Sequence, residues 1–125
     1  MVAASGNSSL DMKETYKTDH ILYLPGDIKS VIAVSAVSNN QITTYSNFDP
    51  NIQFCAPGGD LAYIDGYVDL NQMMYCPYPT SMDNGLSSIG VPQGYTFSCG
   101  TSPSTPAVTA GLADILSCCR KNNQE

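Results

Sequence analysis

The sequence predicts an α/β fold for this chain of 125 residues. Two runs of small and β-branched residues, at 2–5 and 30–37, have the composition of strands. A third strand is expected at 52–56, and a run of small and apolar residues at about 103–118 indicates a helix near the end of the chain. This length is sufficient for one domain.

The first half of the chain is expected to alternate strands with polar connections. A polar loop follows the first strand over residues 8–20. The second strand ends at Ser38-Asn39-Asn40, which predicts a turn because Asn side chains bond nearby backbone groups and tolerate a left-handed conformation. Gly58-Gly59 predicts another turn after the third strand.

The stretch from about 60 to 96 is expected to be extended or rich in hairpins. Turn-forming residues occur along it at short intervals, at Pro77, Pro79, Asn84-Gly85 and Pro92-Gln93-Gly94. Residues 95–97 then predict a strand that returns the chain to the start of the final helix.

The start of that helix carries a motif with chemical meaning. Gly100-Thr101-Ser102-Pro103 places a serine in a first turn, where N–H groups lack intrahelical partners and the helix dipole is positive. An oxyanion formed by attack of the Ser102 hydroxyl would face these donors, as acyl transfer requires. Taken alone, the motif favours a simpler interpretation, an ordinary capped helix.

Further segments in the same order along the chain change this balance. Residues 1–7, Met-Val-Ala-Ala-Ser-Gly-Asn, are similar to the V-V-A-A-x-G-N strand of the subtilases, the subtilisin-like serine peptidases. Residues 24–37 resemble their Y-P-A-x-x-x-x-V-I-A-V-G-A-V segment, and Ala56-Pro57-Gly58 resembles their A-P-G turn. Residues 100–108 are similar to G-T-S-M-A-x-P-x-V, with Pro-Ser in place of Met-Ala.

The resemblance implies the C-terminal half of a subtilisin-like parallel sheet with flanking helices. It covers residues 1–119, with a hairpin-rich insertion at about 60–96, and leaves a polar tail at 120–125. The style of the insertion resembles that of the lantibiotic leader peptidases.

The resemblance also implies roles for individual residues. Ser102 is expected to be the nucleophile, and the Asn7 side chain is expected to donate to the oxyanion. The residues expected to bind substrate are Ser5, Gly6, Tyr23, Gly100 and Thr101, with Tyr23 where the family usually has glycine at the pocket floor. Three carboxylates that follow Asn7 either favour a basic substrate residue or are solvated loop charges: Asp11, Glu14 and Asp19.

The largest departure from the family is the lack of a catalytic base. Subtilases supply an aspartate and a histidine from segments before the oxyanion asparagine, whereas His20, the single histidine, follows Asn7. A triad without one member keeps roughly 10³–10⁴-fold catalysis over water, a figure that comes from subtilisin, the family resembled here. The chain alone is therefore expected to be inactive.

The expected activity is that of a serine endopeptidase that acts on peptides or proteins and lacks its N-terminal half. The lack of that half fits a truncated reading frame, a processed product or a degenerate remnant. The alternative is an inactive remnant that binds peptides in an extended groove by strand addition.

Composition bounds the partners and the location. Charged residues are 13% of the chain and its net charge is −6, so binding to a nucleic-acid backbone, which needs clustered Lys and Arg, is excluded. No apolar run is long enough to span a bilayer. Abundant Ser, Thr, Asn, Gly and Pro are typical of extracellular hydrolases, and a secreted or cell-surface location is expected.

No cofactor and no metal are expected. The cysteines form an odd set of five without a C-x-x-C pair, and Cys55 and Cys99 are expected to be small buried residues more often than disulfide partners. Asp27, Asn51 and Gln53 lie where some relatives bind a cation, but amides replace carboxylates there, and calcium needs several charged oxygens.

Overall fold

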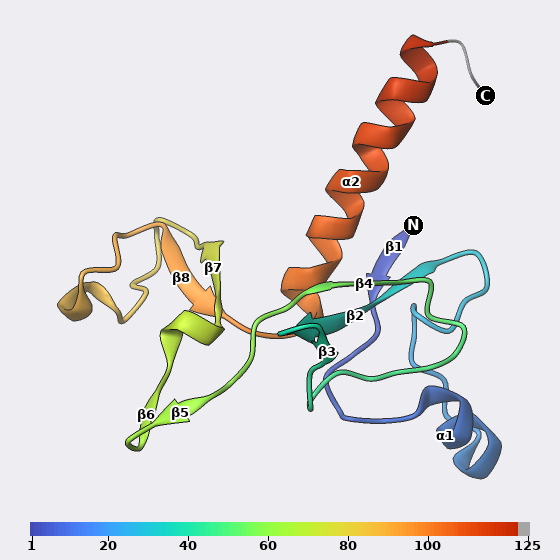
Figure 1. The fold of residues 1–125 in the computed structure, drawn as a ribbon, viewed down its shortest axis with the longest axis horizontal. Helices are drawn as coiled ribbons and strands as arrows, with labels where there is room; N and C mark the ends of the chain where they lie inside the picture. Colours follow the sequence, from blue (N-terminus) through green and yellow to red (C-terminus); the bar gives the residue numbers. More distant parts are fainter. Residues whose placement is uncertain (123–125) are drawn as a thin grey trace.

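A small, mostly parallel sheet forms the centre of the computed structural model, which describes residues 1–122 (Figure 1). The strand β2 (Ile32–Ser38) pairs in parallel with β1 (Val2–Ala4) and with β4 (Phe54–Pro57). Val34 pairs with Ala4 on one side and Phe54 on the other, so β1 and β4 flank β2. The mixed α/β class predicted from the sequence is confirmed.

The turn predicted after β2 is present and forms a tight hairpin. Asn39 and Asn40 have positive φ values of 50° and 63°, and the short strand β3 (Gln41–Ile42) returns antiparallel to the end of β2. Two successive left-handed residues are what a type I′ turn requires, and Asn accepts that conformation more readily than most residues. The strand β3 itself was not predicted.

The expected polar loop at 8–20 is wrong over most of its length, because residues Met12–Asp19 form the helix α1. The Asp11 carboxylate accepts a hydrogen bond from Glu14 N at 3.1 Å and so caps the helix, and His20 ends it in a left-handed conformation. Met12 is the one buried residue of α1, so a single side chain fixes the helix against the rest of the molecule.

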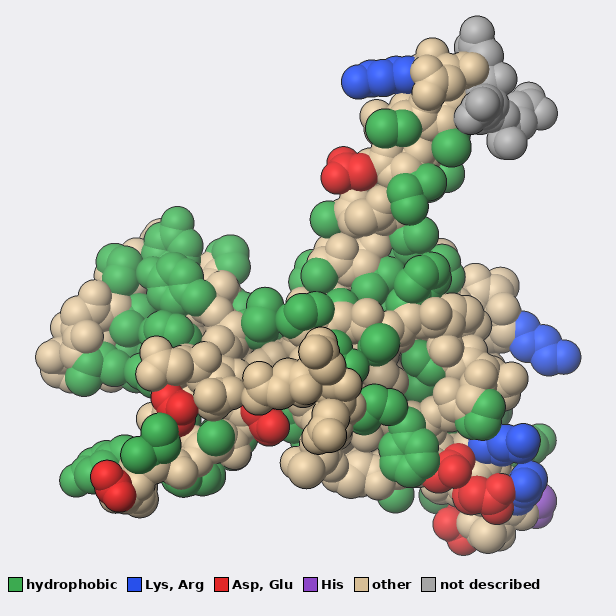
Figure 2. Space-filling model, in the orientation of Figure 1, with side chains coloured by type: hydrophobic (Ala, Val, Ile, Leu, Met, Phe, Trp, Pro, Cys, Tyr) green, Lys and Arg blue, Asp and Glu red, His purple; other side chains and the backbone are tan. Residues whose placement is uncertain are grey.

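The segment between β4 and the last helix, residues 60–98, is hereafter the hairpin segment. Two short hairpins account for its strands, β5 (Tyr63–Ile64) with β6 (Tyr67–Val68), and β7 (Met74–Pro77) with β8 (Tyr95–Ser98). Two 3₁₀ turns, Leu70–Gln72 and Ser87–Ile89, complete it. Hairpins were expected here, and Figure 2 shows many hydrophobic side chains on the surface of this segment.

The helix α2 (Thr101–Lys121) packs its first turns on β1, β2 and β4 and then projects away from the sheet (Figure 1). It begins two residues earlier and ends three later than expected from the sequence. The expected polar tail at 120–125 therefore begins inside the helix, and residues 123–125 lie outside the described part of the chain.

Much of the apolar surface of α2 faces solvent. Ile115 is 60% exposed and Leu116 is 57% exposed, and Figure 2 shows hydrophobic side chains along the projecting helix. The buried core is correspondingly small and consists of Ala3, Met12, Val31, Ala33, Val34, Ala36, Ala56 and Val91. Parallel sheets are normally covered on both faces, so this fold has the features of a partial domain.

Candidate active site

The loop after β1 meets the start of α2, which brings together residues 94 positions apart in the sequence. The Asn7 side-chain oxygen accepts hydrogen bonds from Thr101 N at 2.9 Å and from Thr101 Oγ1 at 2.8 Å. Gly6 N donates to Thr101 Oγ1 at 3.2 Å. The side-chain oxygen of Asn7 is thus fixed. The side-chain nitrogen of Asn7 lies near Gly100, 3.1 Å from the position that a Cβ on Gly100 would occupy.

The backbone donors at the start of α2 can be counted one by one. Gly100 N donates to Gly58 O at 2.9 Å and to Tyr45 Oη at 3.0 Å, and Thr101 N donates to Asn7. Pro103 has no N–H. The first turn of a helix has no internal partners for these groups, so Ser102 N is the donor left open among them.

Two tight contacts place this helix start. The turn after β4 lies so close to it that a Cβ on Gly58 would be 2.5 Å from Ala36 Cβ and 2.6 Å from Gly100 O. Tyr45 Oη donates to Gly59 O at 2.6 Å and accepts from Gly100 N, so it joins that turn to α2. Burial raises the pKa of Tyr45 above its ordinary value, which keeps this hydroxyl protonated.

Sequence reasoning did not single out Tyr45 or the neighbouring Asn47. Asn47 is fully buried and bonds to the loop that carries Asn7. Residues 44–47, Thr-Tyr-Ser-Asn, are similar to the A-S-F-S segment of the subtilases, but that similarity assigns no role to Tyr45 or Asn47. A polar residue beside a buried strand was the available signal, and it was too weak to give either side chain a role.

The five residues expected to bind substrate have different surroundings. Thr101 and Ser5 are 1% and 2% exposed, and the Ser5 hydroxyl donates to Asn47 O at 3.2 Å. Gly6 N donates to Thr101, and Gly100 N donates to Gly58 and Tyr45. These four residues therefore support Asn7 and Ser102 from within the protein, and the side chain of Ser5 has no free face for a substrate.

Tyr23 is the exception among the five, because it does not lie with the others. Its N–H donates to the Asp27 carboxylate at 2.6 Å, within a turn. The adjacent Leu24 and Pro25 instead line a groove of about 880 Å³ with Ser102. The pocket-floor role expected of Tyr23 stays a prediction.

That groove lies between the outer edge of β1 and α2. Its lining is mostly apolar and includes the hydroxyl residues Ser102, Thr105 and Thr109, of which Ser102 belongs to the candidate site. The groove is lined by Val2, Ala3, Ala4, Leu24, Pro25, Ser102, Thr105, Pro106, Thr109, Ala110 and Ala113.

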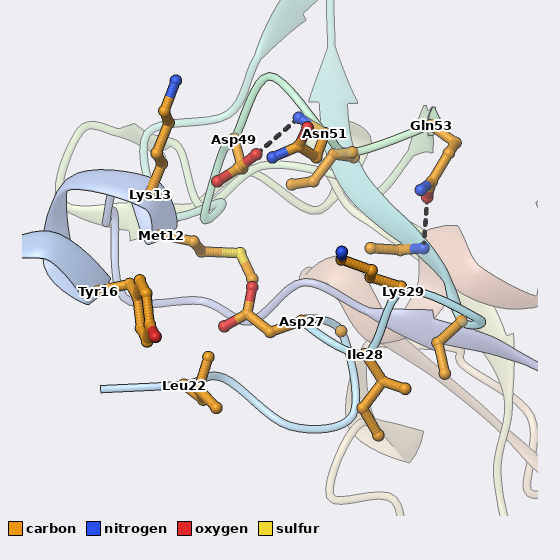
Figure 3. A pocket seen from close by; sticks show the side chains of 14 residues that line it. Met12, Lys13, Tyr16, Leu22, Asp27, Ile28, Lys29, Asp49, Asn51 and Gln53 are labelled. Carbon is orange, nitrogen blue, oxygen red and sulfur yellow. Dashed lines mark hydrogen bonds between the residues drawn. The ribbon is translucent and has the colours of Figure 1, made fainter. Parts of the chain in front are cut away.

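A second cavity of about 650 Å³ lies beside α1 and away from Ser102 (Figure 3). Its lining includes Asp27, Asn51 and Gln53, the three residues considered above as a possible cation site. The Gln53 side-chain oxygen accepts from Ala33 N at 2.9 Å and the Asp27 carboxylate accepts from Tyr23 N, so both are used within the protein. Across residues 1–122 there is no group of three His, Cys, Asp or Glu side chains that could hold a metal ion.

His20 lies at the exposed end of α1, with its ring centroid 6.1 Å from that of Tyr16. No interaction connects it with Ser102 or Asn7 in the described part of the chain. The three carboxylates of this region, Asp11, Glu14 and Asp19, belong to α1 or its cap, and Glu14 pairs with Lys17 at 2.5 Å.

The cysteines differ from expectation in their burial. Cys55 is exposed because β4 has no neighbour on its outer edge among the described strands, and Cys99 is half-buried. Within residues 1–122 all five cysteines are free thiols. Burial raises the pKa of Cys99, with a further increase from Asp60, and burial raises the pKa of Cys76.

Comparison with protein families gives one match over almost the whole chain. The model described as the subtilase family matches residues 1–124. No curated protein matches. Within residues 1–122, no helix is both long and apolar enough to cross a membrane.

Several solved structures resemble this chain. A lanthipeptide protease is 33% identical, with a TM-score of 0.86 over 94% of this chain and 37% of its own. The nisin leader peptidase NisP from Lactococcus lactis is 22% identical, with a TM-score of 0.58 over 90% of this chain and 34% of its own. The epidermin leader peptide processing serine protease EpiP from Staphylococcus aureus is 24% identical, with a TM-score of 0.57 over 90% and 28%. The chain thus spans little more than a third of these proteins or less.

Proposed function

The chain belongs to the subtilase family of serine peptidases, and we propose that it supplies the nucleophile and the oxyanion donors of a subtilisin-type endopeptidase. One observation carries the proposal. Asn7 is bonded to Thr101, the residue before Ser102, at a helix start where Ser102 N is the open donor.

In this proposal the Ser102 hydroxyl gives its proton to the base and attacks the peptide carbonyl. The C–N bond then breaks, the amine leaves with that proton, and water hydrolyses the acyl-enzyme that remains. The carbonyl oxygen becomes an oxyanion that receives hydrogen bonds from Ser102 N and from the Asn7 amide. Because Thr101 donates to the side-chain oxygen of Asn7, the side-chain nitrogen is oriented before substrate binds. Preorganised donors of this kind often contribute more to catalysis than any other single effect.

The base and its aspartate would come from a further polypeptide segment, since His20 lies on α1 and apart from Ser102. The apolar groove between β1 and α2 suits such a segment, because it combines an unpaired parallel strand edge with small side chains. The chain spans 37% of the lanthipeptide protease, which leaves room for such a segment in a protein of that length.

The proposed substrate is a peptide. By its 33% identity to a lanthipeptide protease, this chain is proposed to take part in cleavage of a lanthipeptide. Such an enzyme would work outside the cell or at its surface. The sparse charge of the chain, 13% of its residues, agrees with this location.

The test is to extend the reading frame upstream of Met1 and to express the longer chain with an Asp and a His segment. Cleavage of peptide substrates is then measured by mass spectrometry for the unmodified protein and for Ser102→Ala. The matched control is Ser117→Ala, an exposed serine on the same helix. We expect cleavage to be lost only in Ser102→Ala.

If both variants cleave as well as the unmodified protein, Ser102 is not the nucleophile. If no upstream segment with Asp and His exists, the alternative of an inactive peptide-binding module is tested by titrating the chain with extended peptides. Binding without turnover would then replace the endopeptidase proposal.

A further inference from the structure

A single buried side chain, that of Asn47, bonds to the backbone on both sides of Asn7. Its side-chain nitrogen donates to Ser5 O at 3.0 Å, before Asn7. Its side-chain oxygen accepts from Ser8 N at 2.9 Å and from Leu10 N at 3.2 Å, after Asn7. Its backbone N donates to Gly6 O at 2.8 Å. Four hydrogen bonds therefore define the path of the loop that presents Asn7.

The environment of Asn47 makes these bonds specific. The residue is 0% exposed, so water cannot replace the hydrogen bonds that a substitution would remove. Gly6 has a φ of +105°, and a Cβ there would be 2.6 Å from the Asn47 side-chain nitrogen. The loop therefore passes so close to Asn47 that only glycine fits at position 6.

Asn47 is in turn fixed to the central strand. Its backbone oxygen accepts hydrogen bonds from Ser35 Oγ at 2.8 Å and Ser46 Oγ at 3.0 Å, and Ala36 N donates to Ser46 Oγ at 3.0 Å. No buried side-chain polar atom lacks a partner in the described part of the chain. A satisfied buried network of this kind is rigid.

We propose that Asn47 is a positioning residue for the oxyanion donor. Its hydrogen bonds connect β2 to the loop of Asn7 and thereby set the direction of the Asn7 side-chain amide. Catalytic groups must be held within about 0.5 Å of their productive positions by supporting hydrogen bonds. Thr101 fixes the tip of the Asn7 side chain, and Asn47 fixes the backbone from which that side chain extends. This inference rests on the proposed function.

The kinetic test is a double-mutant cycle in the longer, active polypeptide. Asn7→Ala is expected to lower kcat by about 10²–10³-fold, a magnitude taken from subtilisin, the namesake of this family. Asn47→Ala is expected to lower kcat at least tenfold with KM changed less than threefold. In the Asn7→Ala background it should lower kcat by less than twofold, because its effect passes through Asn7.

Two further variants separate positioning from general loss of stability. Val91→Ala creates a cavity in a buried position of the hairpin segment and should leave kcat unchanged. Asn47→Asp keeps an acceptor for Ser8 N and Leu10 N but loses the donor to Ser5 O. Its kcat should lie between that of Asn47→Ala and that of the unmodified enzyme. If the effects of Asn7→Ala and Asn47→Ala on kcat multiply, the proposal is overturned.

A structural measurement decides the inference even if no peptidase activity is found, in which case it is the proposed function that has failed. Amide hydrogen exchange is measured on the same longer polypeptide. Asn47→Ala should accelerate exchange at Ser8 and Leu10, while Ser5 N, which donates to Val34 O at 3.0 Å, stays protected. Unchanged exchange at Ser8 and Leu10 would show that Asn47 does not hold the loop.

Discussion

At the scale of the residue, the candidate site is built from side chains that complete the hydrogen bonds of distant backbone. Asn7 acts as a cap for α2 from another part of the chain, because Gly100, the residue at the cap position, has no side chain to do so. Thr101 links Asn7 with Gly6 through one hydroxyl. The chemistry at Ser102 therefore depends not only on Asn7 but also on Thr101 and Gly6, which would not themselves touch the reacting atoms.

Replacement of Thr101 by Val should reveal this dependence. The change keeps the shape of the side chain but leaves Gly6 N without its acceptor and Asn7 with one donor fewer. We expect the free energy of unfolding to fall by about 1–3 kcal/mol, the cost of an unsatisfied buried group. Urea denaturation measures this, with Thr101→Ser as the control that keeps the hydroxyl. Equal stability of the two variants would contradict the assigned role.

The thiols give a second prediction at this scale. Since burial raises the pKa of Cys99 and Cys76, less of each is thiolate at pH 8, and the thiolate is the reactive form. Iodoacetamide should therefore modify the exposed Cys55 and Cys118 first, and the rates at Cys99 and Cys76 should still be rising at a higher pH. Peptide mapping by mass spectrometry follows the order. In urea, where the chain is unfolded, the cysteines should react at equal rates. Equal rates in the folded protein would contradict the predicted order.

At the scale of the element, α1 shows what sequence reasoning can miss. Its capping signal, Asp11 with Glu14 three residues later, was present in the sequence, but only Met12 of the helix is buried. A helix with so small an apolar face has almost no hydrophobic periodicity, and hydrophobic periodicity alone therefore predicted a polar loop here. Local hydrogen bonds, and not packing, decide this element.

If so, the cap should carry a measurable part of the stability of α1. Asp11→Ala is expected to lower the free energy of unfolding by about 0.5–2 kcal/mol. Asp19→Ala is the matched control, because it removes a negative charge from the unfavourable end of the helix dipole and should be neutral or slightly stabilising. Thermal denaturation followed by circular dichroism compares the two. A larger loss in Asp19→Ala would show that α1 is held in another way.

The remaining elements followed their signals more closely. The strands β2 and β4 were predicted to within two residues at each end. The small and β-branched side chains of β2 are mostly buried, whereas in β4 only Ala56 is buried. The turn at Asn39-Asn40 was predicted from the tolerance of Asn for a left-handed backbone, which the structure shows. Asn7, Thr101 and Ser102 were named from the sequence. The burial of Ser5 and the hydrogen bonds of Asn47 depend on tertiary contacts that no local pattern records.

At the scale of the whole molecule, apolar surface without a partner is the dominant feature. The outer edge of β1 has no neighbouring strand among the described residues, and the projecting part of α2 exposes Ile115 and Leu116. Soluble monomers seldom expose large contiguous apolar patches, and exposed apolar side chains on a projecting helix are typical of an interface. The proposed further segment would cover it.

The chain alone should therefore associate in solution. Sedimentation velocity is expected to show oligomers whose proportion rises with protein concentration. Leu116→Lys should reduce the proportion of oligomers, because this variant places a charge in the apolar surface of α2. Ser117→Lys adds the same charge at a neighbouring polar position and should have a smaller effect. A monomer at all concentrations would mean that the exposed surfaces do not drive association.

The aromatic side chains of the hairpin segment have a spectroscopic consequence. The chain contains no tryptophan, so tyrosine dominates its near-ultraviolet signal. Tyr75 and Tyr95 stack across β7 and β8 with ring centroids 5.0 Å apart and planes 5° apart. Such a pair couples its transitions and contributes to the circular dichroism, and a Tyr75→Phe variant identifies that contribution among the eight tyrosines of the chain. The folding of the hairpin segment can thus be followed separately from that of the sheet, without any introduced label.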